Sequence, residues 1–296
     1  MIEKITPEHP LAEVFGFPVS NVSEQAKRYR DNRLCPFNNR VPSCTKDKAS
    51  DPLGVCSIFD DGEIAVTCPI RFRQDWIIAE DAASFFFPSG TSWTSLTEVR
   101  LNDRDGKSAG NIDVVLVSYN ERGRVLEFGA LEVQAVYISG NVRRPFEYYM
   151  EDPSSRQDMV WKGRQYYPRA DYLSSSRKRL APQLIFKGGI LNAWERKIAV
   201  AMDKNLFQTL PKLEETTREE AEVAWLVYDL QPNPATTEYT LSRHQILYTS
   251  FETALTQISR PDPGNESEFI ERLQTKLDEK LEDGNPPDAP TIEVEL

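Results

Sequence analysis

The chain has 296 residues, of which 40% are hydrophobic and 27% charged, and its formal net charge is −11. These values are ordinary for a globular protein with a sizeable core, and the absence of any apolar run of about 18 residues argues against a transmembrane helix. The N-terminal stretch MIEKITPEHPLAEVFG lacks the basic and apolar regions of a secretory signal, so we expect a cytoplasmic location.

The charge is distributed unevenly along the chain. Residues 261–296 contain eleven Asp and Glu but three Lys and Arg, so most of the net negative charge lies there. Basic clusters occur earlier, at residues 71–73, 143–144 and 177–179. Each cluster has solvated surface as its ordinary explanation, but DNA binding depends on the local field of a cleft, so the negative total does not exclude it.

All the cysteines lie close together in the sequence. Cys35, Cys44, Cys56 and Cys68 fall within 34 residues, and the first and last each precede a proline. Four thiolates suit a tetrahedral zinc or iron site, which would be structural because no position is left for water. The alternatives are two disulfides, which are typical of secreted chains, or four unrelated buried thiols.

The predicted elements begin with a short helix and an irregular arm in residues 1–30, followed by the loop-rich cysteine segment. Residues 97–103 fit a helix or a strand. Residues 113–119 and 125–138 are rich in β-branched residues and predict two strands, with Asn120 to Gly123 as the turn between them.

Helical patterns dominate the second half of the chain. Residues 180–191 fit a short strand or helix, and residues 222–230 predict a buried strand. Residues 265–284 predict an amphipathic helix with Asn265 and Glu268 as a capping box, and the last dozen residues a loose tail. Apolar residues four apart predict helices at 192–210 and 243–258, where they are Trp194, Ile198, Met202 and Leu206, then Leu247, Phe251, Leu255 and Ile258.

Strands mixed with helices predict an α/β or α+β core. We divide the chain into an N-terminal arm with a four-cysteine module (residues 1–75), a core (76–260), and an acidic C-terminal helix with a tail (261–296).

Acidic residues stand inside the predicted hairpin. Glu132 and Gln134 alternate with apolar residues and share one face of their strand, and Asp113 begins the preceding strand. Two carboxylates on neighbouring strands are costly to bury unless a cation joins them, and Mg²⁺ prefers such oxygen ligands. The pattern therefore favours a Mg²⁺ site in which Gln134 orients a water; a strand cap at Asp113 and a solvated edge strand are the alternative.

Several separated motifs together resemble the NotI family of Type II restriction endonucleases. They are CPFNN, CPIRF, GNIDVVLV, LEVQAVYISGN and PQLIFKGGILNAW, in that order, and the similarity spans residues 30–210. The resemblance implies an α/β PD-(D/E)xK nuclease core, a mixed β-sheet flanked by helices, in which glutamine replaces the usual lysine. It also implies a homodimer that cuts a GC-rich palindrome with Mg²⁺.

The resemblance also implies roles for individual residues. Asp113, Glu132 and Gln134 match the catalytic positions, with the two acids binding Mg²⁺. Glu98 matches an acidic position that some nucleases of this core use as an extra metal ligand, with a plain surface glutamate as the alternative. The family's structural iron or zinc would be held by Cys35, Cys44, Cys56 and Cys68.

The leading hypothesis is a sequence-specific, Mg²⁺-dependent DNA endonuclease with a methyltransferase partner encoded as a separate protein. A nuclease-like DNA-binding protein without activity, or an electron-transfer protein built on a thiolate-held iron, are the alternatives. The candidate DNA contacts are Arg143, Arg144, Arg177, Lys178 and Arg179.

Overall fold

A computed structural model describes residues 8–38, 42–260 and 263–282. The chain forms two compact units, Met1–Ser259 and Arg260–Leu296. The described part of the second unit contains helix α9 (Glu266–Glu282), which confirms the helix predicted there, and Asn265 Oδ1 accepts the Ser267 N–H at 2.9 Å. The tail predicted for the last dozen residues lies outside the described residues.

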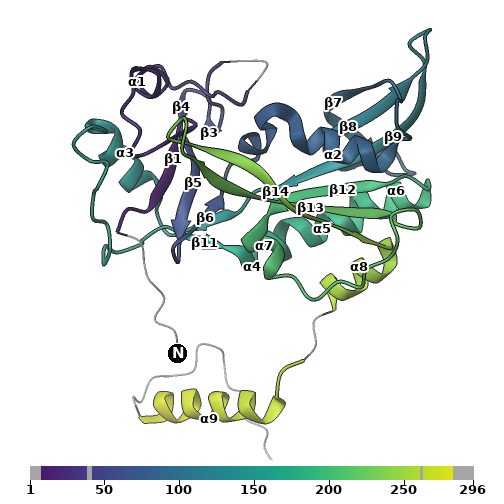
Figure 1. The fold of residues 1–296 in the computed structure, drawn as a ribbon. Coiled ribbons are helices and arrows are strands. Elements are labelled where there is room, and N and C mark those ends of the chain that lie inside the picture. Colours follow the sequence, from purple (N-terminus) through teal and green to yellow (C-terminus); the bar gives the residue numbers. More distant parts are fainter. Residues whose placement is uncertain (1–7, 39–41, 261–262, 283–296) are drawn as a thin grey trace, which may run out of the picture. The chain divides into compact units, whose positions relative to one another are not determined.

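A six-stranded mixed sheet forms the centre of the first unit, in the order β14-β13-β12-β9-β8-β7 (Figure 1). β12 runs parallel to both β9 and β13, and the other neighbours are antiparallel. This agrees with the predicted mixed sheet flanked by helices. The strands are β7 (Trp93–Asn102), β8 (Ser108–Tyr119), β9 (Val125–Gln134), β12 (Ile198–Asp203), β13 (Val223–Asn233) and β14 (Glu238–Thr249).

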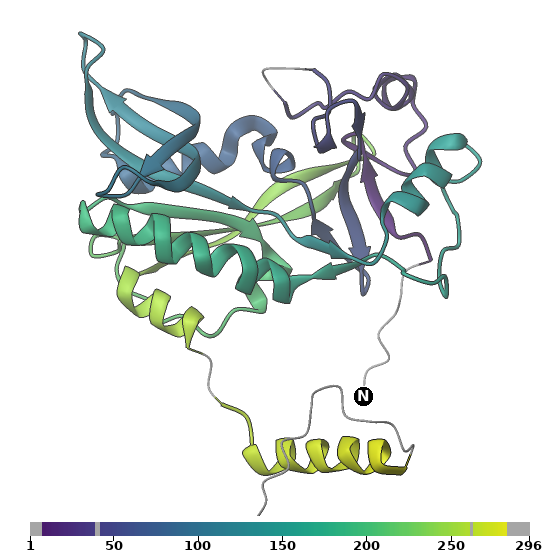
Figure 2. The same cartoon turned by 180° about the vertical axis from the view of Figure 1, so that it is seen from behind.

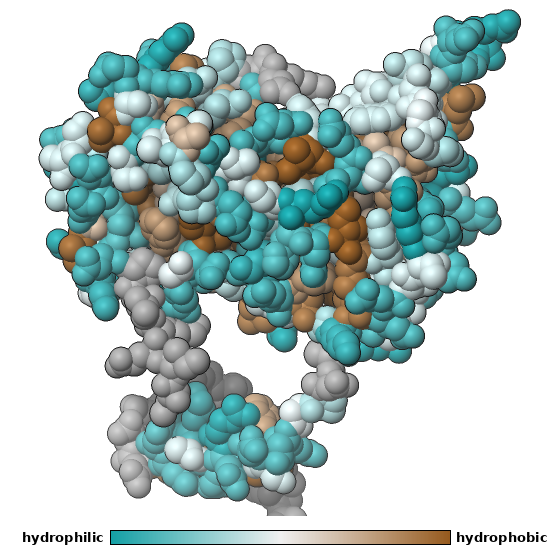
Figure 3. Space-filling model, in the orientation of Figure 1, coloured by the Kyte–Doolittle hydropathy of each residue, from teal (hydrophilic) through white to brown (hydrophobic). Residues whose placement is uncertain are grey.

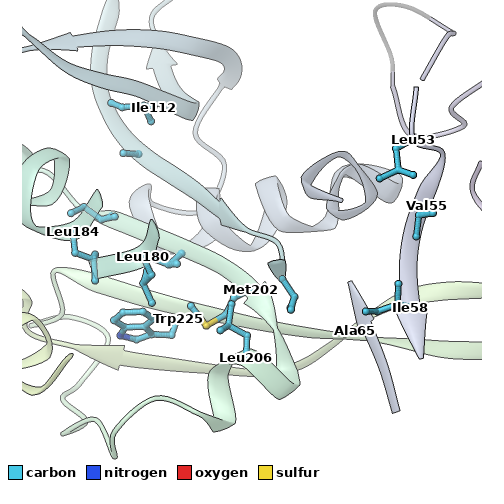
Figure 4. Packing of buried hydrophobic residues seen from close by; sticks show 14 of the residues in the cluster. Leu53, Val55, Ile58, Ala65, Ile112, Leu180, Leu184, Met202, Leu206 and Trp225 are labelled. Atoms are coloured by element: carbon cyan, nitrogen blue, oxygen red, sulfur yellow. The ribbon is translucent and has the colours of Figure 1, made fainter. Parts of the chain in front are cut away.

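Helices cover both faces of this sheet, and each face buries its own apolar cluster. On one face α2 (Ile77–Phe86) packs on Val114, Leu131 and Leu226. On the other face a long helix lies along the sheet (Figure 2), and its Leu180 and Leu184 lie near Trp225 (Figure 4). The elements on this second face are α4 (Tyr172–Ser175), η2 (Ser176–Leu180), α5 (Ala181–Gln183), η3 (Leu184–Gly188), α6 (Gly189–Ala193), α7 (Lys204–Gln208) and α8 (Phe251–Ser259).

A smaller four-stranded sheet, in the order β2-β1-β5-β6, is built from the N-terminal residues. It joins the large sheet where the Val66 N–H donates to Asp203 Oδ2 at 3.0 Å and the Val136 N–H donates to the Val66 carbonyl at 2.8 Å. Its strands and the remaining elements are β1 (Leu11–Val14), β2 (Phe17–Pro18), α1 (Glu24–Asp31), β3 (Asp47–Lys48), β4 (Asp51–Pro52), β5 (Val55–Asp60), β6 (Glu63–Val66), η1 (Pro69–Trp76), β10 (Tyr137–Ser139), α3 (Arg143–Glu151) and β11 (Arg169–Asp171).

Two predicted helices are wrong in part. Residues 198–203 form strand β12, and only the five residues of α7 that follow are helical. Residues 238–249 form strand β14, so the helix predicted from residue 243 begins at Phe251. All six residues of β12 are buried. A strand buried on both faces carries apolar residues at every spacing, including the four-residue spacing that suggests a helix.

The predicted hairpin at residues 113–138 is confirmed. Asn120 and Gly123 form its turn: the Gly123 N–H donates to the Asn120 carbonyl at 2.8 Å, and Gly123 has a φ of 71°. Residues 97–103, left open as helix or strand, lie mostly in β7. Two β-strands, β1 and β2, form in the N-terminal segment that was predicted to be an arm with one helix.

The visible surface in Figure 3 is mostly hydrophilic, with separate hydrophobic patches. None of the helices in the described ranges is long and apolar enough to cross a membrane.

Candidate active site

The β8–β9 hairpin brings the three predicted catalytic residues together. Val114 pairs with Leu131, and continuing this antiparallel register places Asp113 opposite Glu132. The Asp113 carboxylate accepts the Val133 N–H at 2.8 Å, which fixes it against β9. Glu132 and Gln134 are buried on the same face of β9, with exposed fractions of 4% and 1%.

The long helix over this face of the sheet closes the site from above. Residues 172–193 are helical throughout, with two π-helical segments, η2 and η3, on either side of α5. Pro182 lies in α5, where a proline lacks the N–H for a helical hydrogen bond and its ring crowds the preceding turn. Wider π turns relieve this crowding and occur often at functional sites.

Two polar side chains of this helix reach the acidic residues. Lys187, in η3, places Nζ 2.5 Å from Glu132 Oε2, and Gln183 Oε1 accepts a hydrogen bond from Gln134 Nε2. Glu132, Gln134, Gln183 and Lys187 line one small cavity, whose other walls are mostly apolar. The helix therefore supplies polar groups exactly where the strand carries its own.

The charge of Glu132 is poorly compensated. Its Oε1 atom is buried and has no hydrogen-bond partner. Burial and the neighbouring Asp113 charge raise the pKa of Glu132 to about 8, while Lys187 acts in the opposite direction. Two close carboxylates of which one is buried and half-paired fit a divalent cation, because Mg²⁺ is usually held by one or two carboxylates and keeps several waters.

Glu98 lies at the same level of the sheet. It stands in β7 between Thr97 and Val99, which pair with Val114 and Ile112, so it is opposite Asp113. Its side chain is exposed, and its backbone has a left-handed φ of 56°, which is strained for a residue other than glycine. The structure thus places Glu98 near the acidic pair in the sheet but not buried with it.

The four cysteines lie apart from the acidic pair, in the N-terminal segment. All four are free thiols, and all except Cys35 are buried. Burial raises the pKa of Cys35 to about 11, and the charges of Cys68 and Cys44 add to the shift, which indicates that these side chains are neighbours. In residues 8–38, 42–260 and 263–282, however, no group of three or more His, Cys, Asp or Glu is arranged to hold a metal ion, so the four-cysteine metal site is not supported.

The predicted DNA-binding residues fall into two groups. Arg143 begins α3 and forms ion pairs with Asp47 at 2.6 Å and Asp51 at 2.9 Å, whereas Arg144 is exposed. The second group lies in η2 on the long helix, where Arg177 and Lys178 are exposed and Arg179 stacks over the Tyr137 ring with its guanidinium carbon 5.0 Å from the ring centre. Only this second group is on the helix that contacts the acidic residues.

Sequence reasoning missed Lys187 and Gln183. Both occur in the stretch LAPQLIFKGGIL, where they are four residues apart and the only side chains with polar groups on that apolar stretch. Four residues is one helical turn, so this spacing places both on one face of a helix. A lysine inside an otherwise apolar helix was the available signal, because lysine is almost never fully buried unless it is paired.

The arrangement brings two carboxylates, an amide and an ammonium group together on the central strands of a mixed sheet, which suits metal-assisted hydrolysis. The sequence profile of the family described as Restriction endonuclease NotI matches residues 19–241. A search of curated proteins finds no match. The family match covers most of the chain, and the protein therefore belongs to the NotI family of restriction endonucleases and is a type II site-specific deoxyribonuclease.

Proposed function

We propose that this nuclease makes Mg²⁺-dependent double-strand cuts at a specific GC-rich palindrome, with Asp113, Glu132 and Gln134 as its catalytic residues. The observation that carries the proposal is the buried acid Glu132, which has an unpaired oxygen beside a second carboxylate. A site of this kind gains most from a divalent cation. Exposed Glu98 is the candidate for a further acidic contact to the metal.

The chemistry follows from the roles of these groups. When bound, Mg²⁺ supplies positive charge that polarises the scissile phosphate and makes a nearby water more acidic. Because Gln134 Nε2 donates to Gln183, its own Oε1 is left to accept a hydrogen bond from the attacking water. The water oxygen bonds to phosphorus as the bond to the leaving sugar oxygen breaks; water loses a proton to solvent, and the leaving oxygen takes one up.

The DNA partner and the assembly complete the proposal. A palindrome has two-fold symmetry, so we propose a homodimer, which sedimentation of the purified protein tests. We propose phosphate and base contacts from the exposed residues of η2 and from Arg144, with a separate methyltransferase protecting the host site. We keep the cytoplasm as the compartment, and the ranges 1–75, 76–260 and 261–296 as the functional parts of the chain.

The catalytic assignment is tested by Glu132→Gln, which keeps the shape of the side chain and removes its charge. Purified wild-type protein with Mg²⁺ should cut plasmid DNA into discrete fragments, and we expect the variant to bind DNA but to cut at least about 100-fold more slowly. Glu127→Gln is the matched control, because Glu127 lies on the same strand but pairs with Arg196 in a partly exposed position. Cutting by Glu132→Gln at the wild-type rate would remove Glu132 from the site.

We further propose that the four cysteines hold a structural iron or zinc when the metal is supplied. In support, all four thiols are free and their charges influence one another. Elemental analysis of protein purified without chelator should find about one zinc or iron per chain, and Cys56→Ser should lower that content and the melting temperature. Full-length protein that contains neither metal and melts at the same temperature with chelator would contradict this.

A further inference from the structure

Lys187 is held in the site by contacts on both sides of its ammonium group. Nζ donates to Glu132 Oε2 at 2.5 Å and to the Asn111 carbonyl at 2.9 Å, and the side chain is 6% exposed. Its aliphatic stem passes Gly110, where an added Cβ would lie 3.6 Å from the lysine Cδ. The two hairpin strands and the π-helical segment therefore all help to place this one charge.

Stability alone does not account for this placement. Burying an ammonium and a carboxylate costs several kcal/mol per ion, which is repaid only when the remaining donors and acceptors are also satisfied. Here Glu132 Oε1 has no partner, and a second carboxylate lies close by. A helix that only needed to pack here would be served better by an apolar side chain.

The charges of the site explain what the lysine adds. This argument rests on the proposed function. Asp113 and Glu132 carry two negative charges when ionised, so a bound Mg²⁺ would neutralise them and leave nothing to balance the phosphate. With Lys187 the site has one surplus positive charge, which matches the phosphodiester, and charge on the phosphate oxygens increases further as the water attacks. Gln134, at the position where a lysine is usual, cannot supply this charge.

We infer that Lys187 is a catalytic residue, whose ammonium group neutralises Glu132 in the metal-free enzyme and contacts the scissile phosphate once metal and DNA are bound. A lysine suits this exchange because its charge sits on a flexible four-carbon stem. Mg²⁺ and the ammonium group compete for the same carboxylate, so metal binding favours release of the lysine toward the phosphate.

This competition gives the proposal a readout that a purely structural lysine would not produce. The experiment measures single-turnover plasmid cleavage by the full-length protein over a series of Mg²⁺ concentrations. The variants are Lys187→Met, Lys187→Gln and Lys187→Arg, with Lys212→Met as a control at an exposed lysine after α7. Melting temperature and DNA binding with Ca²⁺ in place of Mg²⁺ are recorded for each.

We expect both neutral variants to lower the maximal rate by about 100-fold or more. We also expect their half-saturating Mg²⁺ concentration to fall, because Glu132 has lost its competing cation. Lys187→Arg should retain part of the rate, and Lys212→Met should match the wild type. Lys187→Gln serves if the methionine variant does not fold, because its amide can still donate to the Asn111 carbonyl.

Either of two results would overturn the inference while leaving the proposed function intact. One is wild-type maximal rate in a neutral variant. The other is a lower rate accompanied by a higher Mg²⁺ requirement, which is what a merely structural lysine predicts. If the wild-type protein does not cut DNA at any Mg²⁺ concentration, the proposed Mg²⁺ site fails, and the inference fails with it.

Discussion

Two buried ion pairs in this chain differ in how completely their atoms are satisfied. Glu13 and Arg71 are fully buried; both Glu13 oxygens lie 3.0 Å from Arg71 Nε, and Ser57 donates to Glu13 Oε2 at 2.8 Å. The remaining Arg71 nitrogens donate to Gln74 Oε1 and to the Tyr239 carbonyl. Glu132 and Lys187 are nearly as buried, but Glu132 Oε1 has no partner.

The difference separates a structural pair from a functional one. A fully paired charge cluster fixes packing, and here it joins β1 to η1 and to β14. A half-paired cluster beside another carboxylate stores unfavourable free energy that an incoming cation can release. The variants below separate the two classes: changes at the first pair should affect stability, and changes at the second should affect activity.

The largest effect is expected for Asp113→Asn. The substituted amide oxygen can still accept the Val133 N–H, but one metal-binding charge is lost. We expect cleavage to fall about 1,000-fold, which corresponds to roughly 4 kcal/mol, while the melting temperature stays equal or rises because repulsion with Glu132 is removed. Single-turnover cleavage and a thermal melt check this, and a loss of stability without loss of rate would contradict it.

Glu13→Ala should show the opposite pattern. It leaves the buried Arg71 guanidinium without its carboxylate, so we expect the free energy of unfolding to fall by roughly 3–5 kcal/mol. Urea titration measures this. At temperatures where the variant remains folded, cleavage should stay near the wild-type rate; a specific loss of rate in stable protein would place this pair in the functional class.

His9 tests whether an unpaired buried atom must mark the active site. Its Nδ1 accepts the Leu11 N–H at 3.1 Å, its Nε2 has no partner, and burial lowers its pKa to about 4. Below about pH 6.5 the unfolded chain binds a proton that the folded chain does not, so stability is lost as the pH falls towards 4.

His9→Asn should remove this dependence, because asparagine can accept the same N–H without titrating. We expect the stability lost between pH 7.5 and pH 5 to be roughly 2 kcal/mol smaller in the variant, measured by urea titration at both values, with cleavage unchanged. Equal losses in the two proteins would show that His9 is not the group responsible.

The smallest effect is expected for Arg143→Ala. The ion pairs of Arg143 with Asp47 and Asp51 are partly exposed, so their loss should cost less than about 1 kcal/mol of stability. These carboxylates also neutralise its charge, so DNA affinity should fall less than in Arg144→Ala. Binding measured over a salt series compares the two; a larger loss in Arg143→Ala would make it the better DNA contact.

The sequence could predict the acidic hairpin because its local signals agree. Alternating β-branched residues and the turn at Asn120 and Gly123 point to the same structure. Strand β12 was mistaken for a helix because Ile198 and Met202 are compatible with either period when every residue is buried. Lys187 could not be assigned because its partner is 55 positions away, and only the packing of the long helix on the sheet brings the two together.

The most direct test of the account is a crystal of the protein soaked in Mn²⁺, with anomalous scattering recorded at the manganese edge. We predict one peak per chain within coordination distance of both the Asp113 and the Glu132 carboxylates, with Lys187 moved away from Glu132. A fully occupied manganese peak elsewhere, with the Lys187–Glu132 contact intact, would contradict the central claim that these two acids hold the catalytic metal.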